Sequence, residues 1–190
     1  AYIADGEALV VDGEESQTGE SVGDLIVFSS DGSQLAYVKG DLRGGRIFWG
    51  ESEQKGHSFG CSARFAAWSC ATFTADGSSL AYTTPLLSEN VGAGAQLLQS
   101  RVVRDGVREP FSLSCCLVPG PEGSQLAYVS PGPLVIVDGR PVEVPDLPTG
   151  LTAADLAFSA DGKTLGFLLY EPFIKPSSIT KLYLDTVDVP

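Results

Sequence analysis

Methionine is absent from this sequence of 190 residues, and His57 is its single histidine. Basic side chains are scarce, because 12 Lys and Arg stand against 24 Asp and Glu, which gives a formal net charge of −12. An acidic surface repels nucleic-acid phosphates, so we expect no nucleic-acid partner. No apolar run reaches the roughly 20 residues of a membrane helix, so we expect no membrane insertion either.

The chain begins at Ala1 rather than at a methionine. We therefore expect either that a signal or pro-segment has been removed or that the chain is a piece of something longer. The hydrophobic fraction of 43% is too high for intrinsic disorder and suffices for one domain over residues 1–190. The 22 glycines and 12 prolines indicate many short elements joined by turns.

Four cysteines leave the redox state open. The segment from Cys61 to Cys70 has a spacing that suits a disulfide across adjacent strands, whereas Cys115 and Cys116 would point to opposite faces of a strand. The alternative is four buried free thiols. Zinc is not expected, because there is no CxxC motif and only one histidine, and we predict no metal and no cofactor. The cysteine pattern and the missing start favour an extracellular, periplasmic or other cell-envelope location.

One phrase recurs along the chain, and each copy centres on an acidic residue followed by glycine. The copies read VFSSDGSQLAYV (27–38), TFTADGSSLAYT (72–83), VPGPEGSQLAYV (118–129) and AFSADGKTLGFL (157–168). Their acidic residues, Asp31, Asp76, Glu122 and Asp161, lie 45, 46 and 39 residues apart. A second phrase of the LVVDG type occurs at 9–13, 46–50, 101–106, 134–139 and, degraded, at 181–186. A repeat of this length is typical of propellers and solenoids.

Each repeat is expected to form strands. Asp-Gly between two apolar runs is a strong hairpin signal, because glycine adopts positive φ and the aspartate side chain caps the turn. Runs such as LIVF (25–28) are apolar throughout, which is typical of a sheet covered on both faces. The sequence therefore predicts an all-β fold, a β-propeller of four-stranded antiparallel blades with four to five blades represented. The predicted units are roughly 1–24, 25–68, 69–114, 115–154 and 155–190.

The number of predicted strands does not divide evenly into blades. Four predicted strands carry the FSxDG-like start of the first phrase, five carry its Ala-Tyr-like end and five carry the LVVDG type. The chain opens within the first phrase, at Ala1-Tyr2. We therefore expect either a compact ring of about five blades with one incomplete, or part of a propeller of about six to eight blades.

The phrases FSSDGSQLAY, FTADGSSLAY and FSADGKTLGF resemble the FSPDGxxLAY phrase of TolB-type propeller repeats, which also occurs in the propellers of tricorn protease and prolyl-oligopeptidase relatives. The resemblance covers nearly the whole chain. It departs from the family phrase at VPGPEGSQ (118–125), where proline replaces phenylalanine and glutamate replaces aspartate. The resemblance implies the fold and is almost silent on function.

No catalytic set is predicted, and we expect a protein that is not an enzyme. The segment GHSFG (56–60) matches the G-x-S-x-G elbow of hydrolases, but the only histidine lies beside Ser58 inside the motif and cannot fold back as its base. The aspartates lie one per unit rather than in a D-x-D-x-D cluster, so we interpret them as turn caps rather than calcium ligands. No phosphate-binding G-x-x-x-x-G-K-[ST] loop occurs.

Recognition is expected in the variable connections. In a propeller, the connections between second and third strands open on the same face as those between blades, opposite the Asp-Gly turns. Two insertions, 85–99 and 171–179, and the blade-joining segment 52–69 belong to that face. Their candidate partner-binding residues are apolar: Leu86, Leu87, Leu97, Leu98, Phe173, Ile174 and Trp68. The alternative is that these side chains pack over the rims of their own blades.

The sequence thus favours a non-catalytic propeller that acts as a protein-binding module or structural subunit of an extracellular or cell-envelope assembly, with a protein partner or self-association. One alternative is the propeller portion of a serine peptidase, of the prolyl-oligopeptidase or tricorn kind, without its catalytic domain. Another is a TolB-like translocation accessory protein. Sugar binding by stacking on Trp49 or Trp68 also stays open, although both residues are expected to pack between blades.

Overall fold

Strands and turns make up the described part of the chain. The computed structural model describes residues 1–4, 8–17, 22–40, 45–50, 57–59, 70–85, 100–113, 115–130, 134–142, 152–170 and 183–189. These residues contain no helix, and therefore no helix that is long and apolar enough to cross a membrane.

The strands form five separate antiparallel sheets, and within each sheet neighbouring strands are consecutive in the chain. The first two sheets hold β1 (Tyr2–Ala4), β2 (Ala8–Val11) and β3 (Glu14–Gln17), then β4 (Val22–Phe28), β5 (Leu35–Lys39), β6 (Arg46–Trp49) and β7 (His57–Ser58). The third and fourth hold β8 (Ala71–Phe73), β9 (Leu80–Pro85), β10 (Ser100–Arg104) and β11 (Val107–Leu113), then β12 (Cys115–Pro119), β13 (Leu126–Ser130), β14 (Leu134–Val137) and β15 (Arg140–Val142). The fifth holds β16 (Thr152–Phe158), β17 (Thr164–Tyr170) and β18 (Tyr183–Asp188).

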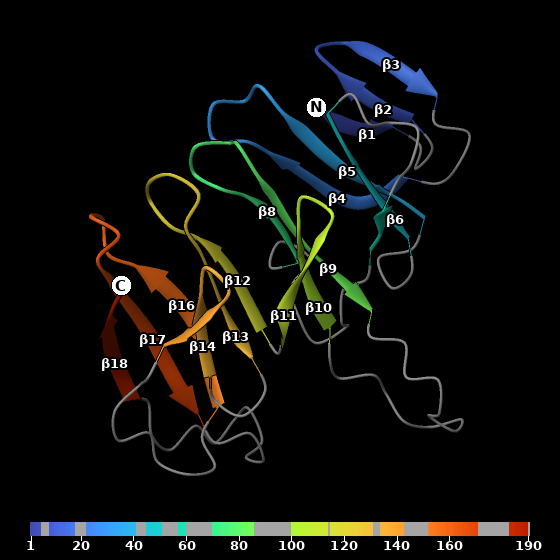
Figure 1. Cartoon of the computed structure of the whole chain (residues 1–190). Coiled ribbons are helices and arrows are strands. Elements are labelled where there is room, and N and C mark those ends of the chain that lie inside the picture. Colours follow the sequence, from blue (N-terminus) through green and yellow to red (C-terminus); the bar gives the residue numbers. More distant parts are fainter. Residues whose placement is uncertain are drawn as a thin grey trace, which may run out of the picture.

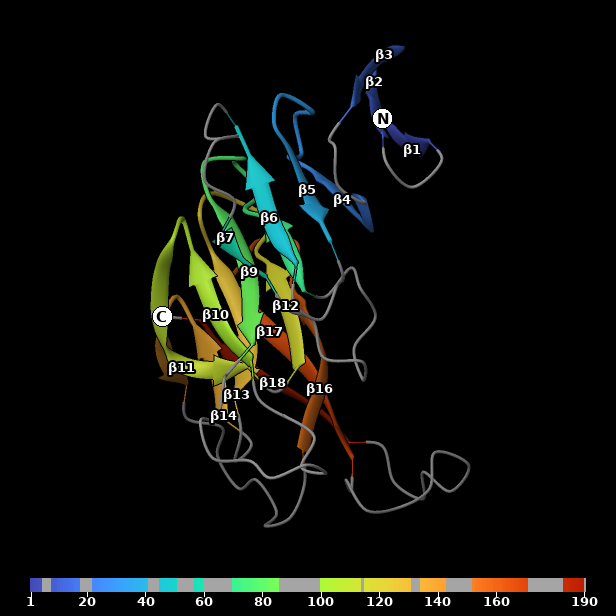
Figure 2. The ribbon, with the colours of Figure 1, turned by 90° about the vertical axis from the view of Figure 1, so that its right-hand side faces the viewer.

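The sheets are arranged side by side along an arc (Figure 1). Their first strands line the inner side, where β4 contacts β8, β8 contacts β12 and β12 contacts β16. The sheet β1–β3 stands at one end of the arc and β16–β18 at the other, and the view turned by 90° again shows β1–β3 apart at one end (Figure 2). The predicted fold class, an all-β assembly of propeller blades, is confirmed.

Each recurring phrase occupies the same position in every sheet. The part of the first phrase before its acidic-Gly turn contributes to β4, β8, β12 and β16, and the part after the turn, which carries Ala-Tyr, contributes to the second strands. The LVVDG type of phrase forms the third strands. The described residues of the N-terminal sheet therefore lack a first strand, and those of the C-terminal sheet lack a fourth. The second sheet begins at Val22, three residues before the expected boundary at residue 25.

The Ala-Tyr dipeptide explains how neighbouring sheets pack. Consecutive strand residues point to opposite faces, so the small residue faces the following sheet and the aromatic ring faces the preceding one. Ala81 accordingly packs in one cluster with Tyr128, and Ala127 in one cluster with Phe167. The small side chain leaves space for the ring of the next blade. Both faces of each internal sheet are covered in this way, which accounts for strands that are apolar throughout.

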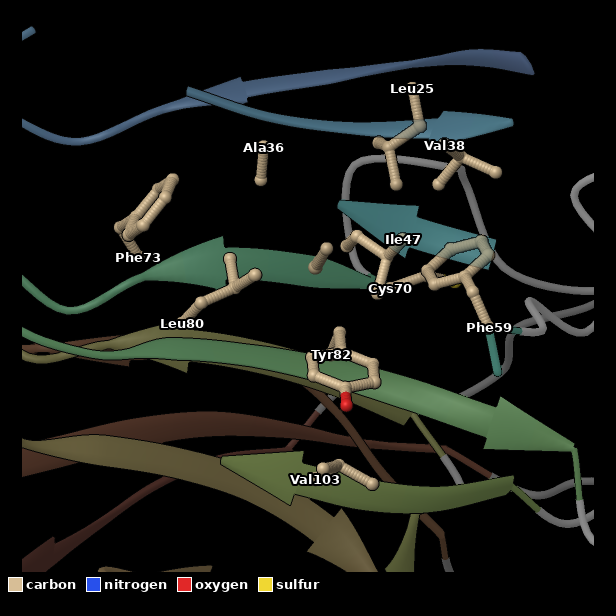
Figure 3. Packing of buried hydrophobic residues seen from close by; sticks show 11 residues of the cluster. Leu25, Ala36, Val38, Ile47, Phe59, Cys70, Phe73, Leu80, Tyr82 and Val103 are labelled. Carbon is tan, nitrogen blue, oxygen red and sulfur yellow. The ribbon is translucent and has the colours of Figure 1, made fainter. Parts of the chain in front are cut away.

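The packing between the second and third sheets is the largest of these clusters (Figure 3). Leu25, Ala36 and Val38 from one sheet point toward Leu80 and Tyr82 of the next. The ring centroids of Trp49 and Tyr82 lie 5.6 Å apart across this boundary. Trp49 therefore packs between blades, as its sequence context predicts.

Candidate functional site

The face opposite the Asp-Gly turns is the candidate functional face, and the strand register shows how its connections are anchored. Ser100, at the start of β10, pairs with Pro85, at the end of β9, so residues 86–99 leave and re-enter the third sheet at one paired rung. In the fifth sheet, Leu169 pairs with Tyr183, so residues 171–182 are anchored in the same way. The strand ends that flank both predicted insertions thus lie at the same rim of the arc, and Pro85, the first residue of the predicted insertion 85–99, belongs to β9.

Short connections separate the corresponding strands of the other sheets. Lys39 pairs with Arg46 across one of them, and Ser130 pairs with Leu134 across another. Between the first and second sheets, the buried rings of Tyr37 and Phe48 stack with their centroids 5.6 Å apart. The Lys39 ammonium lies 4.8 Å from the Phe48 centroid and the Arg46 guanidinium carbon 5.9 Å from it, so two cations lie near this ring at the strand ends.

The candidate binding residues themselves, Leu86, Leu87, Leu97, Leu98, Phe173, Ile174 and Trp68, lie outside the described residues. Their role therefore stays a prediction. Part of the segment 52–69 differs from the expected open connection. His57 and Ser58 form β7, which pairs with β6, and Phe59 is fully buried in the core between the second and third sheets. Sequence reasoning missed this strand because two residues carry too little pattern to mark it.

The backbone at Ser58 also bears on the G-x-S-x-G match. A nucleophile elbow needs a sharp turn from a strand into a helix. Ser58 instead lies within an antiparallel strand at the edge of its sheet. Among the residues that the structure describes, no group of three or more His, Cys, Asp and Glu side chains is placed to hold a metal ion.

Cys70 is buried and disulfide-bonded, so the free-thiol alternative is wrong for this residue. The predicted partner, Cys61, lies outside the described residues, and the pairing of these two cysteines stays a prediction. Cys70 lies directly before β8 in the core between the second and third sheets.

On the opposite face, the turns after the first strands share one hydrogen-bond pattern. Asp31 accepts bonds from the Ser29 hydroxyl at 2.6 Å, the Ser33 hydroxyl at 2.9 Å and the Ser33 amide at 3.0 Å. Asp76 and Asp161 occupy the same position in their turns. The glycine after each aspartate has a positive φ of about 70°, which this tight turn requires. These aspartates are turn caps, as predicted.

The same bonds fix the ionised form of the three carboxylates. The Ser29 hydroxyl, followed by the Ser33 amide and hydroxyl, lowers the pKa of Asp31 from 3.8 to about 2. The Ser78 amide and the Thr74 hydroxyl lower the pKa of Asp76, and the Ser159 hydroxyl and the Lys163 amide lower that of Asp161. The folded state thus binds protons at these sites less readily than the unfolded chain does.

We expect stability to fall on acidification in a window set by these turns. A carboxyl group with a depressed pKa in the folded state stabilises the fold above its unfolded value of 3.8, and this contribution is lost as pH falls toward about 2. Denaturant unfolding at a series of pH values measures the loss. Asp31→Asn should make the free energy of unfolding depend less on pH between about pH 4 and 2. An unchanged pH dependence in that window contradicts the assignment of the lowered pKa to Asp31.

The turns also bond from blade to blade. The Gln34 amide donates to the Gly77 carbonyl at 2.7 Å, the Asp76 backbone amide donates to the Gly123 carbonyl at 3.2 Å, and the Gln125 amide donates to the Gly162 carbonyl at 3.4 Å. The Ser30 hydroxyl additionally donates to the Ala75 carbonyl. Each turn is thereby tied to the turn of the next blade.

Gln34→Ala should therefore loosen the second blade from the third. Loss of one partly buried hydrogen bond is expected to lower the free energy of unfolding by about 1 kcal/mol. Ser33→Ala is the matched control, since it removes a bond within the same turn that is exposed and has its backbone counterpart retained. Equal, negligible effects of both variants on the denaturation midpoint contradict a role for this inter-blade bond.

A second set of aspartates, in the turns after the third strands, binds the start of the second strand of the same sheet. Asp105 and Asp138 both have positive φ, of 49° and 48°, in Asp-Gly turns of type I′ character. Asp105 Oδ1 accepts a bond from the Leu80 amide at 2.9 Å, and Asp138 Oδ1 accepts one from the Leu126 amide at 3.0 Å. The Asp-Gly dipeptide predicts the turn, but the hydrogen bond from the aspartate side chain to the start of the second strand forms only in the folded sheet and has no signal in the sequence.

Ionic groups accompany these caps between the third and fourth sheets. Arg104 Nη2 lies 3.1 Å from Asp138 Oδ1, and Arg104 Nε lies 3.5 Å from Glu109 Oε1. The neighbouring Tyr128 hydroxyl is buried without a hydrogen-bond partner. Burial, followed by the charge of Glu109, raises the pKa of Tyr128 above its usual value, and burial with the charge of Asp105 raises the pKa of Tyr82 to about 12. Both phenols are thus neutral structural groups.

Comparisons with known proteins support the fold. No protein-family model and no curated protein matches the chain. Among solved structures, the chain is similar to TolB from Acinetobacter baumannii, with 15% identity and a TM-score of 0.50, over 91% of this chain and 42% of TolB. A chain of a mitotic checkpoint complex aligns over 93% of this chain and 69% of its own length, with 15% identity and a TM-score of 0.36. The chain spans about two fifths of TolB, and at this identity the likeness shows the fold alone.

Proposed function

We propose that this chain is a non-catalytic β-propeller that serves as a protein-binding module or structural subunit of an extracellular or cell-envelope assembly. The observation that carries the proposal is the origin of its two long connections. The strand ends that flank residues 86–99 and 171–182 lie at the rim opposite the Asp-Gly turns, where Pro85 pairs with Ser100 and Leu169 pairs with Tyr183.

Such anchoring favours recognition. Loops that project from a rigid scaffold are the usual carriers of binding residues, because the scaffold fixes where they begin and end. The third and fifth sheets provide this scaffold through their packed cores, and hydrogen bonds between turns on the other face link the second to the fifth sheets in succession. The apolar residues of the two connections are the contacts that we propose for a protein partner.

The disulfide at Cys70 supports the proposed location. Disulfides persist in oxidising compartments, such as the periplasm and the cell exterior, and are rare in the cytosol. A bonded and buried Cys70 fits such a compartment.

The test uses cross-linking of the purified full chain in extract of its source, followed by size-exclusion chromatography. We expect a stable complex that is lost when Leu86, Leu87, Leu97 and Leu98 are changed to serine, or when Phe173 and Ile174 are. Val107→Ser is the matched control, because Val107 is 71% exposed beside the Asp-Gly turn that joins β10 to β11. A chain that stays monomeric in extract, or a complex that survives both sets of changes, contradicts the proposal.

A further inference from the structure

The strand β1 differs from every other strand of its type. The second strands β5, β9 and β13, which carry Ala-Tyr, and β17, which carries Gly-Phe at the same position, each pair with a strand on both sides. The strand β1 pairs with β2 and stands at the end of its sheet. Among the described residues, the other edge of β1 has no partner strand, and it lies at the position that a first strand occupies in the four other sheets, on the side of β4 (Figure 1).

A phenylalanine is exposed beside this position. Phe28 ends β4 with 44% of its surface exposed, whereas Phe73, at the same position of the next first strand, is 4% exposed. Phe73 packs in the cluster that includes Leu25 of the preceding first strand β4. The first sheet provides no described strand that packs on Phe28 in the same way, so an apolar ring is left uncovered where a first strand would cover it.

A backbone acceptor lies beside the same position. The carbonyls of Gly77, Gly123 and Gly162 each accept a bond from the turn of the preceding blade. Gly32 occupies the equivalent position in the second sheet, and no described residue donates to its carbonyl. A turn that follows a first strand in the N-terminal sheet would supply this donor.

We propose that the edge of β1, with Phe28 and the Gly32 carbonyl, is a docking site for an extended segment from outside residues 1–190 that carries the first-strand phrase of this repeat. The segment adds to β1 as an antiparallel strand, covers Phe28 with an apolar side chain, and ends in a Ser/Thr-x-Asp-Gly turn that bonds to Gly32. The first strands of a second copy do not serve, because β4, β8, β12 and β16 are each paired within their own sheet.

The occupant has a defined chemistry. Strand addition is driven by main-chain hydrogen bonds, and alternate side chains give the specificity. The described first strands β4, β8 and β16 combine apolar residues with the Ser/Thr-x-Asp-Gly turn, and Gln34 and Gln125 show that a glutamine after the turn reaches the next blade. A peptide with the sequence of residues 22–34, VGDLIVFSSDGSQ, contains all three features.

The experiment measures binding of this fluorescently labelled peptide to the purified full chain by anisotropy, with hydrogen exchange to locate it. We expect saturable binding and slower exchange at the amides of residues 2–4. The same peptide with proline in place of its central isoleucine cannot complete the strand pairing, so its binding should be lost. Phe28→Ala in the full chain should lower the affinity for the peptide at least about tenfold.

Val107→Ala is the matched control, since it truncates another exposed apolar side chain far from β1, and it should leave the affinity within about twofold. Several results overturn the proposal: absence of saturable binding, equal binding of the proline peptide, or protection along β18 rather than β1. Self-association of the chain that protects β1 without peptide overturns it as well. None of these results depends on residues 86–99 or 171–182, so the proposed function is tested separately.

Discussion

Replacing Tyr82 by alanine is expected to lower the free energy of unfolding by about 3–5 kcal/mol, the largest effect of any single change considered for this chain. The ring is 1% exposed and lies between the second and third sheets, 5.6 Å from the ring of Trp49. Its removal leaves a cavity between β9, which carries Tyr82, and β6, which carries Trp49, and these strands cannot fill the cavity without losing their register. Denaturant unfolding of the two proteins measures the difference.

The matched control is Tyr2→Ala, which changes the same residue at the same position of the repeat. Tyr2 is 61% exposed because no described sheet precedes its own. Its replacement should therefore change the free energy of unfolding by less than about 0.5 kcal/mol. Equal losses at positions 82 and 2 contradict the view that the aromatic residue of the Ala-Tyr phrase packs against the preceding blade.

The second large effect is expected at Asp138, whose side chain joins the turn after β14 to the start of β13. Asp138→Ala leaves the buried Leu126 amide without its acceptor and places alanine at a φ of 48°. The unsatisfied amide costs about 1–3 kcal/mol and the left-handed backbone about 1–2 kcal/mol, so we expect a loss of about 3 kcal/mol.

Asp138→Asn separates the contributions. Asparagine keeps an Oδ1 acceptor and tolerates positive φ, so it loses mainly the ionic contact with Arg104. We expect less than half of the destabilisation seen with alanine, measured by the same unfolding experiment. If asparagine is as destabilising as alanine, the ion pair rather than the cap dominates at this position, and the account of the turn is wrong.

The strands and turns could be predicted from the sequence because their signals are local. The dipeptides Asp31-Gly32 and Asp138-Gly139 specify turns through positive φ and a capping carboxylate, and these requirements act within a few residues. Apolar runs such as 25–28 predict strands covered on both sides, and a fixed repeat length implies that the sheets are equivalent. The class of fold followed from these features together.

What could not be predicted depends on neighbours that are distant in sequence. Tyr2 and Tyr82 belong to identical Ala-Tyr dipeptides, yet Tyr2 is exposed and Tyr82 is buried. The reason is that, among the described residues, only the sheet of Tyr82 has a preceding sheet against which the ring can pack. The exposure of Phe28 has the same origin. The strand His57–Ser58 is too short to leave a pattern, and the sequence places Phe59 in an open connection although its side chain packs in the core.

The candidate site was predictable only in its location. The ends of β9 and β10, and of β17 and β18, fix where the two long connections leave the scaffold. The identity of a partner is not encoded in strand periodicity or turn chemistry, because those features are shared by blades of every propeller.

A double-mutant cycle between Trp49 and Tyr82 tests the central claim, that successive sheets of this chain stack on one another through the rings of their repeats. The two residues belong to different sheets and are brought together only by that stacking. Unfolding of Trp49→Ala, Tyr82→Ala and the double variant should give a coupling free energy of about 1 kcal/mol. Strictly additive losses, with a coupling that does not differ from zero, would show that the two sheets do not pack face to face.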